Sequence, residues 1–214
     1  MGLPLRPAGA RPHLVVHPLP FAGDDEALVA GLRAESPVAV AAFVARYESH
    51  VRSVLVRILG DDPEVPDLHH DVFLRALRAA RQIKDPGALA GWLSIIAVNV
   101  ARTALKRRER ARWLRFLPWT ELPEVEAPAA TDDDVEALQR TYALLAELPA
   151  DERIAFALRF VEGMDLTEVA TACGVSLATI KRRLRRAEDA FLELARADPR
   201  LAAWLEGGSR WGHR

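Results

Sequence analysis

Cysteine is almost absent from this sequence of 214 residues, which contains a single one, Cys173. One thiol excludes a disulfide framework and a cysteine-based zinc site within the monomer, and it suits the reducing cytoplasm. Long apolar runs are missing as well. The stretch 92–98 is far too short to span a bilayer, and no basic segment precedes an apolar stretch of signal-peptide length. We therefore expect a cytoplasmic protein with no direct membrane insertion.

A net positive charge is also missing, because the chain has 29 lysines and arginines and 30 acidic residues, which gives a formal charge of -1. As a sum, this value argues against nucleic acid, since phosphate contacts need cations. The charges are nevertheless segregated along the chain. Basic residues are concentrated in 102–115 and 181–186, whereas every charged residue of 121–136 is acidic. The two basic segments are candidates for DNA contact.

Alternation of the β-strand type is missing throughout, whereas helical periodicity recurs. Half of the chain is apolar, so it can bury a core. We predict an all-α protein with two small helical domains joined by a flexible acidic linker. The expected segments are a mobile proline-rich leader (1–23), a first domain (24–116), the linker (117–131), a second domain (132–197) and a C-terminal tail (198–214).

Local start and stop signals predict the helices of the first domain. Ser36-Pro37 reads as an N-cap followed by a first-turn proline, and apolar residues then recur at helical spacing until Gly60. A second helix is expected over about 64–81. Asp85-Pro86 repeats the start signal and opens a third helix, which ends in the first basic segment.

The clearest local pattern is a helix-turn-helix over about 165–188. Asp165 followed three residues later by Glu168 is a capping-box-like start. The small Ala170 permits close helix packing, and Gly174 supplies the backbone freedom that a tight turn needs. Ser176 caps the next helix. Cys173 faces inward in this arrangement and is expected to be a buried packing residue.

The second helix of this motif has an apolar and a polar face. The apolar face is expected to hold Leu177, Ile180, Leu184, Ala187 and Phe191. A recognition helix presents its N-terminal half to base edges and its other basic groups to phosphates. The residues expected to bind DNA are Ser176, Thr179, Lys181, Arg182, Arg183, Arg185 and Arg186. A charge run alone would indicate a solvated helix face, but the cap, the glycine turn and the small residue favour DNA binding.

Three motifs follow one another within 24–196. They are Asp67-Leu-His-His-Asp-Val-Phe-Leu-Arg-Ala76, Gly91-Trp-Leu-Ser-Ile-Ile-Ala-Val-Asn-Val-Ala-Arg102, and Leu148-Pro-Ala-Asp-Glu-Arg153 through 174–187. In this order and spacing they resemble regions 2 and 4 of the extracytoplasmic-function (ECF) sigma factors, a class of bacterial transcription initiation factors. His70 replaces the family's usual glutamine, and Val98 stands where an arginine often precedes the asparagine.

The resemblance implies a protein that is not an enzyme and needs no cofactor, metal or small-molecule substrate. It would bind core RNA polymerase at the clamp and flap, and direct promoter recognition, DNA melting and transcription initiation. The helix-turn-helix would read the minus-35 element. The resemblance also makes an anti-sigma factor a possible partner. The acidic linker would keep the free protein from binding DNA tightly.

Two further surfaces are implied by the same resemblance. The residues expected to bind polymerase are Asp67, Asp71, Phe73, Leu74, Arg75 and Arg78, although any of them can instead belong to a solvated face, and Phe73 to the core. The residues expected at the minus-10 element are Trp92, Asn99, Arg102, Thr103 and Lys106. This strip combines an aromatic ring with donors and cations, which suits unpaired bases and phosphates. Trp92 can equally be a core residue.

Two other functions are compatible with parts of the pattern. A polymerase-independent regulator can end in such a helix-turn-helix, but it would need an upstream ligand or phosphoacceptor domain containing strands. A small metal hydrolase could use His69, His70 and Asp71. Adjacent ligands point to different faces of a helix, and no companion histidine cluster is present in the sequence. Neither alternative accounts for the second and third motifs together.

Overall fold

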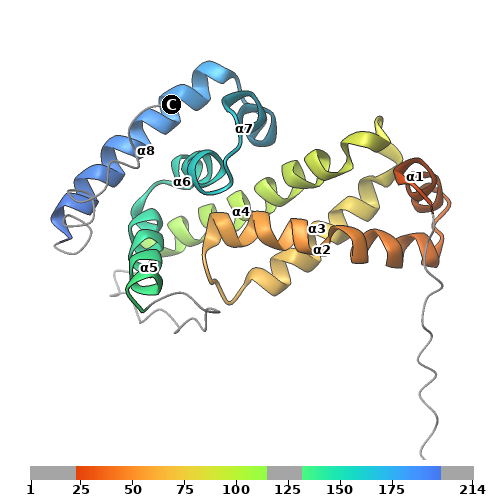
Figure 1. Ribbon diagram of the computed structural model, residues 1–214, viewed down its shortest axis with the longest axis horizontal. Helices are drawn as coiled ribbons and strands as arrows, with labels where there is room; N and C mark the ends of the chain where they lie inside the picture. The colour runs from red at the N-terminus through yellow and green to blue at the C-terminus, as the bar shows by residue number, and fades with distance from the viewer. Residues whose placement is uncertain (1–22, 115–131, 199–214) are drawn as a thin grey trace, which may run out of the picture.

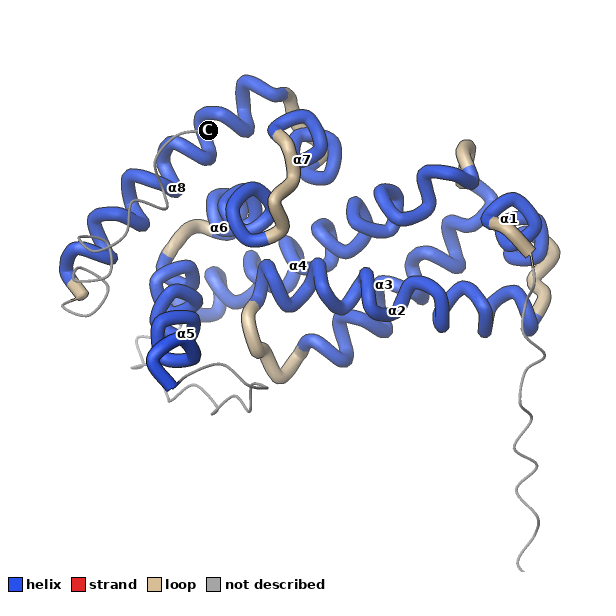
Figure 2. Tube along the Cα trace, viewed as in Figure 1, coloured by secondary structure: helices blue, strands red, loops and turns tan. Residues whose placement is uncertain are grey.

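The computed structural model describes residues 23–114 and 132–198. Most of the predicted leader, the predicted linker and most of the tail lie outside these described residues. Within them every regular element is helical (Figure 2). This finding confirms the all-α prediction.

The first described range, 23–114, is called the first half below and contains four α-helices and two short 3-10 turns. They are α1 (Asp25–Arg33), α2 (Pro37–Leu59), α3 (Val65–Ala79), η1 (Ala80–Gln82), η2 (Pro86–Ala88) and α4 (Leu89–Leu114). The second described range, 132–198, is called the second half and contains four α-helices and one π-helical segment. They are α5 (Asp132–Glu147), α6 (Ala150–Phe156), η3 (Ala157–Val161), α7 (Leu166–Cys173) and α8 (Leu177–Ala197).

The helices of the first half begin and end close to the capping, proline and glycine residues that predicted them. Asp85 accepts a hydrogen bond from the backbone N–H of Gly87 at 2.9 Å and opens η2. Ser36 precedes the first-turn Pro37 as predicted, but its side chain makes no capping hydrogen bond. Gly60 ends α2 with a φ of 75°, a conformation that glycine adopts without the usual steric cost.

The core of the first half lies where α2, α3 and α4 meet. Phe43, Val54 and Ile58 of α2 are fully buried there. Phe73 of α3 is 5% exposed, and its ring lies edge-on to Phe43 with the centroids 5.5 Å apart. The expectation that Phe73 is an exposed polymerase contact is therefore wrong. It lies on the side of α3 that also buries Val72 and Ala76, which turns it toward α2 rather than toward solvent.

The two halves share one continuous apolar core. Ala101 and Leu105 of α4 belong to the same buried cluster as Ile154 of α6 and Val169 of α7. Figure 1 shows α4 running from α1 to α5 and α6, so that it contributes to both halves. A second, smaller cluster joins α5, α6 and α8 around Phe156 and Phe191.

By length and composition, the stretch 86–111 could cross a membrane. No other such helix was found among the described residues. In this fold the stretch forms η2 and most of α4, and α4 packs against α2, α3, α6 and α7. Its apolar residues therefore serve as the central core of the protein.

Candidate nucleic-acid interface

The helix-turn-helix forms as its local signals predict. Asp165 accepts hydrogen bonds from the backbone N–H groups of Thr167 and Glu168 at 2.7 and 2.9 Å. The carboxylate of Glu168 in turn accepts from the backbone N–H of Asp165 at 2.8 Å, which completes a capping box. Gly174 is left-handed, with φ 66° and ψ 35°, and Ser176 caps α8 by accepting from the N–H of Thr179.

Cys173 closes the first helix of the motif and is 4% exposed. Burial raises the pKa of its thiol above the ordinary value. A buried thiol with a raised pKa is a poor nucleophile. The prediction that Cys173 is a buried packing residue is confirmed.

The second helix of the motif, α8, has one buried and one exposed face. Ile180, Leu184, Ala187 and Phe191 are buried as predicted. Leu177 is 40% exposed, so its predicted place on the inner face is wrong. It is the first residue of α8, and the helical wheel gives only its angle around the axis, not whether a neighbour covers that turn.

The polar face of α8 holds most of the residues predicted to bind DNA. The exposed ones are Ser176, Lys181, Arg182, Arg185 and Arg186, and Thr179 is partly buried. Arg183 differs, because its side chain is 20% exposed and turns toward α6. Five polar side chains are thus exposed on α8 and a sixth is partly so, whereas Arg183 is largely covered through its contact with α6.

The residues predicted to bind the minus-10 element lie in order along α4. Asn99 and Thr103 are exposed, and the Thr103 hydroxyl donates to the Asn99 carbonyl at 2.8 Å. Arg102 donates through Nη1 to the side chain of Asn99 at 2.7 Å. Trp92 is half-buried and packs against the main core cluster. The structure therefore brings the polar members together and gives Trp92 a packing role.

Asp151, in the first turn of α6, is the meeting point of cations from both halves. Its Oδ1 accepts from Nε of Arg102 at 2.9 Å. Its Oδ2 lies 3.2 Å from Nζ of Lys106 and 3.1 Å from Nη2 of Arg183. Burial would raise the pKa of Asp151, but the Lys106 hydrogen bond and the three cationic charges outweigh it, and the pKa lies below its ordinary value.

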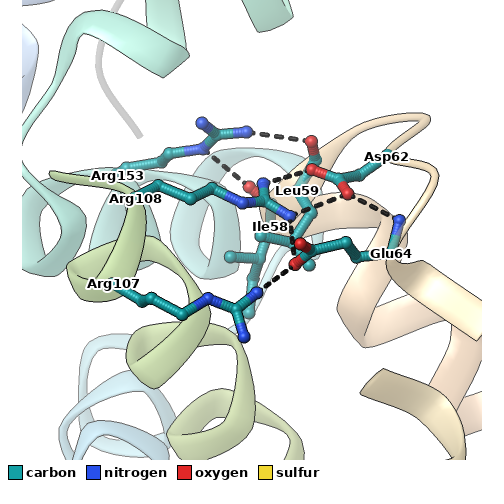
Figure 3. Close-up of polar contacts among 7 residues, drawn as sticks. All are labelled: Ile58, Leu59, Asp62, Glu64, Arg107, Arg108 and Arg153. Atoms are coloured by element: carbon teal, nitrogen blue, oxygen red, sulfur yellow. Dashed lines mark hydrogen bonds and ion pairs between the residues drawn. The ribbon is translucent and has the colours of Figure 1, made fainter. Parts of the chain in front are cut away.

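Arg153, two residues after Asp151 in α6, joins the second half to the end of α2 (Figure 3). Its Nε donates to the carbonyl of Ile58 at 2.8 Å, and its Nη2 donates to that of Leu59 at 2.9 Å. These carbonyls belong to the last turn of α2 and have no partner within that helix. Burial, followed by the nearby charge of Arg108, lowers the pKa of Arg153 to about 10, so that it stays protonated at neutral pH.

A second polar cluster lies beside Arg153 in Figure 3. Arg108 of α4 pairs with Asp62 and donates to Glu64 at 2.8 Å, and Arg107 reaches the same Glu64 oxygen at 2.6 Å. These contacts tie the end of α4 to the turn between α2 and α3. The basic end of α4 is therefore partly engaged by acids of its own domain.

Most of the residues predicted to bind polymerase are exposed on the surface of α3. Asp67, Arg75 and Arg78 are exposed, and Leu74 is 38% exposed. Asp71 pairs with Arg75 one turn away at 2.8 Å. The neighbouring His69 lies against the backbone carbonyl of Glu48. Within the described ranges, no three histidine, cysteine or acidic side chains gather as a metal site would require.

Two family models match this chain, and they match successive parts of it. The model for Sigma-70 region 2 covers 43–111, and the model for Sigma-70 region 4 covers 138–190. The first match contains α3 and nearly all of α4, and the second contains the helix-turn-helix. The chain belongs to the sigma-70 family. It is an ECF-type sigma factor, a non-enzymatic subunit of RNA polymerase that directs transcription initiation.

Curated relatives agree with this assignment of the sigma factor. The RNA polymerase sigma-H factor of Pseudomonas aeruginosa is 28% identical over 178 residues, which are 78% of this chain and 91% of the relative. The ECF RNA polymerase sigma-E factor of Escherichia coli K12 is 27% identical over 176 residues, 78% of this chain and 92% of the relative. Both alignments extend well beyond the helix-turn-helix.

Solved structures share the fold of the sigma factor. CnrH, in complex with the cytosolic domain of CnrY, matches with a TM-score of 0.56 and 23% identity over 81% of this chain and 98% of that one. The sigma factor RpoE of Bartonella quintana, in complex with the anti-sigma factor NepR, matches with a TM-score of 0.55 and 23% identity over 72% and 95%.

The sequence patterns did not predict two residues of the sigma factor whose side chains help to join its halves. Asp151 and Arg153 lie in the third motif, which carried the family resemblance but gave no role to either side chain. An acid in a first helical turn usually interacts with the helix dipole, so Asp151 carried no separate signal. Their partners are distant in sequence: Lys106 is 45 residues from Asp151, and Ile58 is 95 residues from Arg153.

Proposed function

We propose that α8 reads the minus-35 promoter element from the major groove. The observation that carries this proposal is the exposure of Ser176, Lys181 and Arg182 directly after the turn of a capped helix-turn-helix. A recognition helix uses its N-terminal residues to contact base edges, and arginine is the usual reader of guanine. Thr179 extends the same surface, while Arg185 and Arg186 would contact phosphates. Arg183 would join them only after release from Asp151 of α6.

The experiment is run-off transcription with core polymerase on a library of promoters. Arg182→Ala should cost about 1 to 3 kcal/mol of discrimination at one base position. The matched control is Arg196→Ala, which removes an exposed arginine from the last turn of the same helix. A uniform loss across all promoters would assign Arg182 to phosphate contact, and the absence of any specific transcript with wild-type protein would refute the proposal.

We propose that the strip Trp92, Asn99, Arg102, Thr103 and Lys106 binds the minus-10 element as it melts. Exposed amide and hydroxyl groups beside two cations suit unpaired bases and the backbone of a single strand. Asn99→Ala should reduce run-off transcription from a duplex promoter. A promoter with an unpaired minus-10 segment should recover the activity, because the cost of strand separation has then been removed. Equal losses on both templates would contradict a role in melting.

The exposed face of α3 is the proposed docking surface for the polymerase clamp, with region 4 on the flap. Leu74 is its exposed apolar residue, and Asp67, Asp71, Arg75 and Arg78 surround it in the sequence. Such a mixture of an apolar centre and polar neighbours is usual for protein interfaces. Leu74→Ala should weaken binding to core polymerase, whereas Val38→Ala, at another exposed apolar side chain, should not.

An anti-sigma factor is the proposed negative regulator, in the cytoplasm. The support is that CnrH and the Bartonella RpoE were both solved in complex with partner proteins, CnrY and the anti-sigma factor NepR. A two-hybrid screen of the source genome with the full chain should return such a partner. To qualify, the purified partner must abolish run-off transcription when added before core polymerase.

A further inference from the structure

We propose that the free sigma factor is held closed by an autoinhibitory contact, in which Asp151 takes the place of DNA phosphate for cations of both DNA-binding surfaces. The proposal rests on the functions proposed above for α4 and α8. It adds that Arg102 and Lys106 of the minus-10 strip and Arg183 of the minus-35 helix are engaged at the same time, and that one carboxylate in α6 is responsible. Opening of the contact then becomes a required step before promoter binding.

The first support is the identity of the groups around Asp151. Arg102 and Lys106 come from the minus-10 strip and Arg183 comes from the minus-35 helix, and all three lie within 3.2 Å of the carboxylate oxygens. Carboxylates and phosphates are both anions that accept charge-assisted hydrogen bonds from arginine and lysine, so Asp151 satisfies these cations as a phosphate would. The same cations cannot contact DNA while they hold Asp151.

The second support is that Arg183 is incompletely satisfied in this arrangement. Its Nη1 is buried and has no hydrogen-bond partner among the described residues. A buried donor without an acceptor is unfavourable, and a guanidinium that contacted a phosphate from outside would have both ends solvated or bonded. Arg183 is therefore better satisfied in an open state than in the closed one.

The third support is that the contact around Asp151 belongs to a wide interface between the two regions. Arg153 bonds two carbonyls of α2, and Arg57 of α2 pairs with Glu162. Glu109 of α4 accepts from the backbone N–H of Ala150 at 2.6 Å, and the apolar core is continuous across the junction. Separation of the regions would expose this apolar surface, so the closed state is favoured until a partner binds the open one.

Core polymerase is the partner that would favour the open state, because binding α3 on the clamp and region 4 on the flap at the same time would require the two regions to separate. The proposed docking face on α3 is exposed in the closed state, so the first encounter does not depend on opening. A ligand that binds one of two states shifts the population toward it, and DNA affinity is reduced in proportion to the fraction of open molecules. The closed contact thus lowers the DNA affinity of the free factor, so that promoter binding occurs mainly when the factor is bound to polymerase. It also assigns to Asp151 the inhibitory role that the sequence suggested for the acidic linker.

The test measures binding of the free, full-length protein to a fluorescent promoter duplex by anisotropy at one fixed salt concentration. Asp151→Asn should tighten binding by about 5- to 150-fold, the usual range for coupling between sites. Asp189→Asn is the matched control, since it removes the same charge from an exposed position of α8. Arg153→Met is the second variant: it removes a positive charge, yet it should also tighten binding, because it opens the interface from the α2 side.

Small-angle scattering of the same free proteins should give a larger radius of gyration for Asp151→Asn and Arg153→Met than for the wild type. The proposal is overturned if Asp151→Asn and Asp189→Asn bind DNA equally well, if Arg153→Met binds more weakly than the wild type, or if scattering finds the wild type as extended as the variants. Run-off transcription by the wild type with core polymerase is measured separately. Its absence would contradict the proposed promoter role, whereas the scattering result would still report on closure.

Discussion

Arg102 donates through Nη2 to the backbone carbonyl of Cys173 at 3.1 Å, and this bond joins the middle of α4 to the last residue of α7. A cation at the C-terminal carbonyls of a helix is favourable, because those carbonyls lack partners within the helix and carry partial negative charge. The remaining nitrogens of Arg102 contact Asp151 and Asn99. The guanidinium is thus fully engaged inside the protein, immediately before the turn of the helix-turn-helix.

The turn itself depends on the backbone of Gly174. A Cβ at this position would meet nothing within 4 Å, so Gly174→Ala tests the left-handed φ of 66° without a steric clash. We expect a loss of about 1 to 2 kcal/mol in the free energy of unfolding. Gly91→Ala in α4, which also has open space and an ordinary φ, should instead gain about 0.5 to 1 kcal/mol. Urea denaturation of both variants checks the opposite signs.

The capping box of α7 predicts a different loss. Asp165→Ala removes the acceptor of two backbone N–H groups at the start of the helix and should cost about 0.5 to 2 kcal/mol. Asp165→Asn keeps a side-chain oxygen in place and should cost only a few tenths of a kcal/mol. The midpoints of urea unfolding measure both values. Equal losses for the two substitutions would mean that the charge of Asp165, rather than its capping bonds, stabilises α7.

Local patterns predicted the elements of this fold better than the contacts between them. Capping signals at Asp165 and Ser176 involve neighbours within three residues, so they can be recognised in the sequence. Helical periodicity also predicted the buried side of α8, except at Leu177. The interface between the regions depends on pairs such as Arg153 and Leu59, which are 94 residues apart. Neither periodicity nor capping carries information about such pairs, because both patterns describe only residues that are near one another in the sequence.

Phe73 and Leu74 are adjacent on α3 but should respond oppositely to truncation. Phe73 packs edge-on to Phe43 in the core, so Phe73→Ala should cost about 3 to 5 kcal/mol in the free energy of unfolding. Leu74 is 38% exposed, and Leu74→Ala should change stability much less. Calorimetry or urea denaturation gives the stabilities. A large loss at Leu74 would place it in the core and remove it from the proposed docking surface.

The lowered pKa of Asp151 predicts how the closed contact depends on pH. An aspartate whose pKa is lower in the folded than in the unfolded state stabilises the fold at pH values above its unfolded value, about 3.9. The contribution is lost as the pH falls from there through the lower folded pKa. The difference in unfolding free energy between wild type and Asp151→Asn should therefore be constant from pH 7 to about 5 and should shrink below about 4. Urea titrations of both proteins at pH 7, 5 and 3 measure it, and a difference that is as large at pH 3 as at pH 7 would show that the carboxylate charge is not what holds Arg102, Lys106 and Arg183 together.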